Sequence, residues 1–310
     1  MKLLLHIGAA KTGTTAVQNY LALNRQQLLD EGVYLLDDSA TGNNRALAAC
    51  CTNENQFSAF FHYNRVPAED REKYRKSYFR NLIVELDQLD SAIHTVITSS
   101  EDFYGGFLQE ESIERLASYL KPVFDEIEVL IYIRPQLETL DSLYSTFLKT
   151  GQPLSYVKYV ELYFSAASVV YNYDIGLRYW ERGFGLDNMI VRIFKAQDML
   201  NGDLFDDYMQ FLLPDSSIEL RRPNVRLNES LSPFGQRIML ATNRRIEAFS
   251  DEHGWNPNWK RLRDYFSVKF PGKGIAARVP IGHGDIVKMN DSNELVRLRY
   301  FPDRPRLFSA

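Results

Sequence analysis

The beginning of the chain, residues 2–21, constrains the fold more than any other stretch. Residues 3–7 form a short, nearly continuous apolar run, which is typical of a strand buried on both faces of a parallel sheet. The run ends in the small-residue loop 8–15, and apolar residues at helical spacing then predict a helix from about Thr14. Strand, loop and helix N-terminus in this order form an anion site, because backbone N–H groups and the positive end of the helix dipole converge there. No acidic residue precedes Asp30, so this helix end is left open for an external anion.

The loop differs from the nucleoside-triphosphate signature GxxxxGK[ST] at one informative place. Gly8 and Gly13 have the required separation, but Thr14 stands where the signature has lysine, and the lysine lies earlier, as Lys11. Lys11 can still reach a bridging oxygen of a phosphate, and the hydroxyls of Thr14 and Thr15 can bond the anion directly. This pattern favours a ligand held without a magnesium ion. The alternative is a tight turn with incidental threonines.

Strands alternate with helices through the first two thirds of the chain. Strands are expected at 32–36, 94–101, 128–134 and 188–194, and helices at 78–89, 113–124, 140–149 and 204–213. This order implies right-handed βαβ units and an α/β fold, a three-layer αβα arrangement with a central, mostly parallel sheet that is P-loop-like and carries helical insertions. Ligands of such sheets bind beyond the strand carboxyl ends, where Lys11, Glu101 and Arg134 fall.

Length and composition fit one globular domain over residues 1–310, with a basic and aromatic tail at 272–310 that prolines interrupt. The chain has 310 residues, 45% apolar and 25% charged, which are ordinary globular values. The net charge of −4 gives no general attraction to nucleic acid or to an anionic membrane. The only cysteines, Cys50 and Cys51, are adjacent and make no disulfide framework, and no apolar stretch approaches the about 20 residues of a membrane span. We expect a soluble, cytoplasmic protein.

A second phosphate motif follows the strand at 128–134. Arg134 ends that strand and Pro135 starts the next helix, which carries Ser142 eight residues after the arginine. A guanidinium at a strand end offers a bidentate fork for a phosphate, and the helix would bring the hydroxyl of Ser142 round to the same group. Each residue alone has an ordinary alternative, a surface ion pair for Arg134 and an exposed helix position for Ser142.

Both motifs resemble those of the sulfotransferases, which use 3′-phosphoadenosine 5′-phosphosulfate (PAPS) as sulfuryl donor. The sequence KTGTT after a first strand resembles the 5′-phosphosulfate loop of that family, and Arg134 with Ser142 resembles its 3′-phosphate motif. The resemblance implies PAPS as co-substrate and no metal. It assigns cofactor binding to Lys11, Thr12, Gly13, Thr14, Thr15, Arg134 and Ser142.

Glu101 is the expected catalytic base, with Lys11 as the second catalytic residue. Sulfuryl transfer needs a group that takes the proton from the attacking hydroxyl or amine, in line with the departing phosphate. Members of the family use a histidine or a glutamate near this place, and here the strand ends in Glu101. Asp102 is the reserve candidate.

Weaker signals lie elsewhere. Lys273 and Gly274 resemble a late basic segment of the family, although a solvated loop is the alternative. Trp255 and Trp259 could stack on sugar rings or be core aromatics, and residues 43–45 could contact an acceptor.

The sequence therefore predicts a PAPS-dependent sulfotransferase that acts on a hydroxyl, or an amine, of a glycan, glycolipid or small metabolite. A P-loop kinase or other NTP-utilising enzyme is the alternative, and so is a non-catalytic nucleotide-binding module. The acceptor and the oligomeric state stay open.

Overall fold

A computed structural model describes residues 1–38, 41–53, 58–105, 109–214, 216, 218–223, 230–250, 252–272 and 281–308. The chain divides into two compact units. Unit 1 comprises Met1–Arg134, Asn172–Asn224 and Ser292–Ala310, and unit 2 comprises Pro135–Tyr171 and Val225–Asp291. The single domain over residues 1–310 stays a prediction, and each unit is described by itself.

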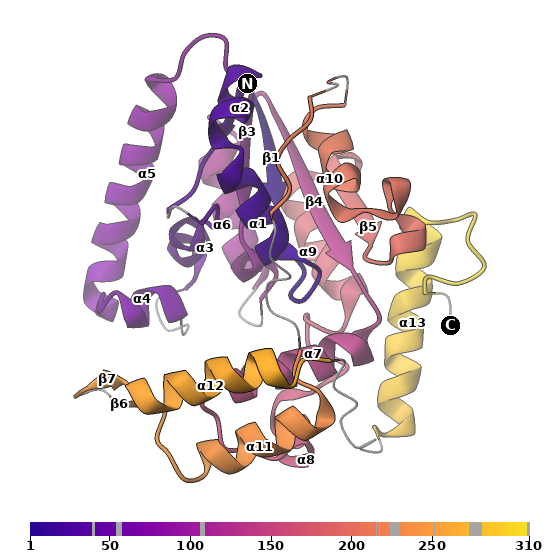
Figure 1. The fold of residues 1–310 in the computed structure, drawn as a ribbon. Helices are drawn as coiled ribbons and strands as arrows, with labels where there is room; N and C mark the ends of the chain where they lie inside the picture. The colour runs from indigo at the N-terminus through magenta and orange to yellow at the C-terminus, as the bar shows by residue number, and fades with distance from the viewer. Residues whose placement is uncertain are drawn as a thin grey trace. The chain divides into compact units, whose positions relative to one another are not determined.

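Unit 1 is built on a five-stranded sheet in the order β2-β3-β1-β4-β5, in which every neighbouring pair runs parallel (Figure 1). The strands are β1 (Lys2–His6), β2 (Val33–Leu35), β3 (Thr95–Ser99), β4 (Glu126–Ile133) and β5 (Met189–Ile193). β1 is central because its apolar residues are fully buried and suit no edge of the sheet. All five expected strands are present, each with bounds within a few residues of the prediction.

Helices cover both faces of this sheet. On one face, α1 (Thr14–Leu23) and α10 (Leu204–Leu212) pack against alternate residues of the strands, such as Leu4 and Leu130. On the other, α9 (Tyr173–Phe184) contacts β4 and β5, and α6 (Glu110–Leu120) packs on α9 (Figure 1). These layers confirm the three-layer α/β fold with a parallel central sheet.

Shorter elements complete unit 1. They are α2 (Arg25–Asp30), α3 (Arg45–Cys51), α4 (Ala59–Tyr63), α5 (Arg71–Asp87) and the 3₁₀ turns η1 (Ala68–Asp70), η2 (Glu101–Tyr104), η3 (Leu186–Asn188), η4 (Ala196–Asp198) and η5 (Leu200–Gly202). η2 begins directly after β3, so it holds Glu101 at the carboxyl edge of the sheet.

Unit 2 is helical, as expected of the insertions. It contains α7 (Gln136–Lys149), α8 (Tyr156–Tyr163), α11 (Pro233–Asn243), α12 (Pro257–Lys269) and the two-stranded hairpin β6 (Phe249–Ser250) and β7 (Gly254–Trp255). Its core gathers Leu140, Leu148, Met239 and Trp259, all fully buried. The indole N–H of Trp259 donates to Asn243 Oδ1 at 2.8 Å, which satisfies the one polar atom of that side chain.

The tail at 272–310 contains a helix that the sequence reading missed. α13 (His283–Tyr300) fills most of the span between Pro280 and Pro302. Its apolar residues do not gather on one face, so no helical period signals it. In unit 1, Arg299 pairs with Asp174 and Glu181 of α9, at 2.8 and 2.9 Å, which binds the end of α13 to α9.

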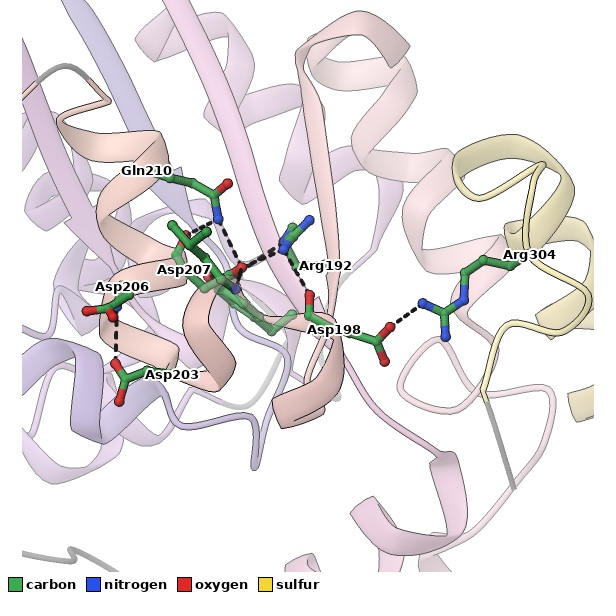
Figure 2. Close-up of polar contacts among 9 residues, drawn as sticks. Arg192, Asp198, Asp203, Asp206, Asp207, Gln210 and Arg304 are labelled. Atoms are coloured by element: carbon green, nitrogen blue, oxygen red, sulfur yellow. Dashed lines mark hydrogen bonds and ion pairs between the residues drawn. The ribbon is translucent and has the colours of Figure 1, made fainter.

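A buried carboxylate joins α10 to the sheet. Asp207 is fully buried and accepts hydrogen bonds from Tyr132 of β4 at 2.9 Å and from Arg192 Nε of β5 at 3.1 Å. The backbone N–H of Leu200 donates to the same carboxylate at 2.8 Å. The side-chain amide of Gln210 also donates to it, at 2.9 Å (Figure 2). Every donor lies on a different element or turn, so Asp207 fixes α10 against β4 and β5.

Asp207→Ala should therefore lower the free energy of unfolding by roughly 3 kcal/mol, because it leaves Arg192 without its buried counter-ion. Urea unfolding followed by circular dichroism measures this. Asp206→Ala is the matched control: its partner Arg222 is 52% exposed, so the loss should stay below about 1 kcal/mol. Equal losses in the two variants would show that the buried network does not fix α10.

Candidate active site at the carboxyl edge of the sheet

Three adjacent strands deliver the predicted catalytic and binding groups to one edge of the sheet. The loop with Lys11 follows β1, Glu101 follows β3 and Arg134 follows β4. Arg134 donates from Nη1 to the backbone carbonyl of Lys11 at 2.9 Å. Burial and the nearby charge of Arg134 lower the pKa of the Lys11 ammonium, and the carboxylate of Glu101 opposes this shift. The structure thus brings these three residues together.

The loop after β1 leads into an open helix N-terminus. Thr12 is 1% exposed, and its hydroxyl donates to the Ala9 carbonyl at 2.7 Å, which closes the turn. Gly13 has φ of +83°, and a Cβ there would lie 2.5 Å from Leu204 Cδ2, so the position requires glycine. In the described structure no side chain caps α1, and its first turn holds no acidic residue. The first N–H groups of α1 are therefore oriented as donors toward an anion.

Arg134 is held from two sides. The hydroxyl of Tyr173 on α9 donates to the Arg134 carbonyl at 2.8 Å, and the guanidinium lies over the Phe194 ring, 5.9 Å from its centroid. These contacts keep the guanidinium beside the loop. Two cations, Lys11 and Arg134, then border the helix N-terminus, which concentrates positive potential in an otherwise acidic protein.

Ser142 lies in unit 2, on α7. Its hydroxyl is 3.2 Å from that of Ser230 in the same unit. The assignment of Ser142 and Arg134 to one phosphate stays a prediction.

Glu101 is bound by donors from three elements. Its Oε2 accepts from Gln18 Nε2 of α1 at 3.0 Å and from Asn43 Nδ2 at 3.4 Å. Its Oε1 lies 3.5 Å from the guanidinium of Arg45 on α3. These contacts hold the carboxylate of Glu101 at the carboxyl edge of the sheet.

Asp102, the reserve candidate, is partly buried, and its side chain is 25% exposed, like that of Glu101. Burial raises the pKa of its carboxyl to about 6, with smaller contributions from the charges of Glu101 and Asp38 that Arg45 opposes. Arg45 Nε is 3.7 Å from Asp102 Oδ2. Arg45 therefore faces both carboxylates, which the sequence reading anticipated only as a weak acceptor contact at 43–45.

Three residues around the site were missed in the sequence. Gln18 lies one helical turn after Thr14, so helix spacing could have placed it on the same face of α1. Tyr173 and Phe194 come from later elements, and no local pattern connects them with Arg134.

The weaker candidates have other surroundings. Trp259 belongs to the core of unit 2, and Trp255, 39% exposed, stacks on it with ring centroids 5.5 Å apart. Lys273 and Gly274 lie outside the described residues. Within the described ranges, no group of three or more His, Cys, Asp or Glu side chains is arranged to hold a metal ion. No helix in those ranges combines the length and apolar content that crossing a bilayer needs.

No known family model matches the chain, and no curated protein matches it in sequence. Among solved structures, it is similar to a sulfotransferase from Alicyclobacillus acidocaldarius, with 14% identity and a TM-score of 0.42 over 93% of this chain and 94% of that one. It is also similar to the sulfotransferase domain of the Synechococcus PCC 7002 olefin synthase, with 12% identity and a TM-score of 0.38 over 93% of each chain. Identities and TM-scores this low do not extend either protein's activity to this chain.

Asp102→Asn should be more stable than the wild type at pH 7.5, and the gap should close toward about pH 4. The folded protein keeps a proton on Asp102 up to about pH 6, whereas the unfolded chain loses it near 3.8, so ionisation destabilises the fold as pH rises through this window. Thermal unfolding at several pH values measures the gap. Asp87→Asn, at the exposed end of α5, is the control. A gap that does not change with pH would contradict the buried environment of Asp102.

Proposed function

We propose that the protein is a PAPS-dependent sulfotransferase. The observation that carries the proposal is the convergence of Lys11, Arg134 and Glu101 around an uncapped helix N-terminus. Two cations beside a phosphate-binding helix end suit a donor with phosphates at both its 3′ and 5′ positions. A held carboxylate at the same edge suits proton removal from an acceptor.

Each residue has a separate role in the proposed reaction. The backbone N–H groups of residues 12–15 bind the 5′-phosphosulfate, and Lys11 stabilises the charge that develops on the bridging oxygen as the sulfur–oxygen bond breaks. Glu101 takes the proton of the attacking group, with the sulfur in line between nucleophile and departing phosphate. Arg134 binds the 3′-phosphate and thereby distinguishes PAPS from ATP.

The acceptor is proposed as a hydroxyl, or less favourably an amine, of a glycan, glycolipid or small metabolite. This part rests on the resemblance of the motifs. The proposal also places the protein in a reducing cytoplasm, where the buried, unpaired thiols of Cys50 and Cys51 persist.

The donor is tested by thermal stability against 3′,5′-adenosine bisphosphate, with 5′-AMP and Mg-ATP as comparisons. A ligand at about a hundred times its dissociation constant should stabilise the wild type by roughly 2.7 kcal/mol. Arg134→Ala should lose this shift, because the guanidinium that binds the 3′-phosphate is gone. Arg182→Ala, an exposed arginine on α9, should keep it. Equal or greater stabilisation by Mg-ATP would contradict the proposed sulfotransferase and favour an NTP-utilising enzyme.

Lys11→Ala should lower the rate of transfer from PAPS by about 10²–10³-fold or more, since Lys11 acts on charge that appears only in the transition state. Binding of the bisphosphate should weaken only partly. Single-turnover assays and the thermal shift measure the two effects separately. Lys76→Ala, 71% exposed on α5, is the control. Full activity of Lys11→Ala would contradict the role assigned to Lys11. If the wild type transfers the sulfuryl group to none of the acceptors tested, a non-catalytic binding module is favoured instead.

A further inference from the structure

A buried chain of polar groups supports Glu101 from behind. Gln18 is 3% exposed, and its Nε2 donates to Glu101 Oε2 at 3.0 Å and to Ser99 Oγ at 3.3 Å. Ser99 is fully buried, and its Oγ lies 2.9 Å from His6 Nδ1. The chain His6–Ser99–Gln18 thus ends on the carboxylate of the proposed base.

Each member of this chain stands on a regular element of the fold. His6 is the last residue of β1 and Ser99 the last of β3, and the two are paired in register in the sheet. Gln18 lies on α1, one turn after Thr14, where the helix N-terminus faces the proposed phosphate site. The same helix therefore connects the phosphate-binding end with Glu101. Side chains held on strands and helices are positioned more rigidly than side chains held on loops.

The two oxygens of Glu101 have different surroundings. Two amide donors, Gln18 and Asn43, converge on Oε2. Among the residues that the structure describes, Oε1 has only the longer contact of 3.5 Å with Arg45, whose side chain is 49% exposed. Among the described residues, Oε1 is thus the oxygen with room for a further hydrogen bond. The neutral amides donate hydrogen bonds to Oε2 without adding a charge. They therefore fix the orientation of the carboxylate and leave Oε1 available to accept a proton.

We propose that Gln18 is a positioning residue, which holds Glu101 by Oε2 so that Oε1 accepts the proton of the acceptor. This inference rests on the proposed function. As the acceptor oxygen bonds to sulfur, its proton moves to Oε1. The bond between sulfur and the bridging oxygen breaks, and its electron pair stays on the 5′-phosphate of the departing bisphosphate. Glu101 later releases the proton to solvent.

The charges around Glu101 are compatible with this role. Lys11 lies on the loop after β1, Arg45 on α3 and Asp102 at the next position in the chain. Arg134, which follows β4, acts on the charge of Lys11. His6 adds none, because burial lowers its pKa to about 3 and keeps the ring neutral. The chain behind Glu101 therefore orients the carboxylate without changing the local charge.

The role is tested first with Gln18→Met, which keeps the volume of the side chain and removes the donor. Transfer from PAPS to 4-nitrophenol and hydrolysis of PAPS in water should both fall by about 10–100-fold in kcat, while KM for PAPS and the thermal shift with the bisphosphate stay within about twofold of wild type. Gln27→Met on α2 is the matched control. A variant with the wild-type kcat would overturn the positioning role.

A second measurement needs no turnover. Gln18→Glu places a carboxylate at hydrogen-bond distance from Glu101, and two such groups share one proton. Its unfolding midpoint should fall below wild type at pH 8 and recover toward pH 5, because the folded pair binds a proton that the unfolded chain has lost. The exchange Gln18→Glu with Glu101→Gln restores one amide and one carboxylate, so it should remove the loss at pH 8. Gln27→Glu should show no such recovery.

The two measurements separate the possible failures. If the exchange restores stability and Gln18→Met slows transfer, Gln18 positions Glu101. If Gln18→Glu loses no stability at pH 8, the contact itself is wrong and the inference fails. If the exchange restores stability but the wild type hydrolyses no PAPS and transfers no sulfuryl group, the contact stands. The proposed function then fails, and the positioning role fails with it.

Discussion

The parallel pairing of β1 with β3 and β4 is the constraint on which the rest of the structure depends. Parallel strands end at one edge, so the loop after β1, η2 after β3 and Arg134 after β4 lie at the same edge of the sheet. The central position of β1 requires burial on both faces, which its leucines allow. The same burial excludes water from behind the site, where His6 and Ser99 support Gln18.

The site sets groups of like charge side by side. Lys11 and Arg134 are adjacent, and burial, with a smaller contribution from their mutual repulsion, lowers the pKa of Lys11. Asp102 is partly buried next to Glu101, and burial raises its pKa to about 6. Titratable groups with perturbed pKa values cluster at functional sites, so these shifts agree with the proposed function.

The sequence predicted most of unit 1 because its signals are local. Short apolar runs, glycine-rich turns and helical spacing define all five strands and α1, α6 and α10 within a few residues. α13 was missed because its apolar residues face several directions, so no helical period indicates it. Gln18 was missed for a related reason. A glutamine on a helix has no special meaning in the sequence until the fold brings Glu101, just after the end of β3, next to it.

The sequence by itself determined the order of strands and helices, the glycine at position 13 and the absence of acidic residues before the first helix. These features depend only on residues that are close together in the chain. The sequence also predicted Lys11, Glu101 and Arg134 at one edge of the sheet, but only the tertiary structure decided which contacts hold them there. Contacts such as Arg134 with the carbonyl of Lys11, Tyr173 with that of Arg134, and Gln18 with Glu101 join residues that are 123, 39 and 83 positions apart. The physical reason is that strand order and helix packing, which set these contacts, arise from burial summed over the whole core.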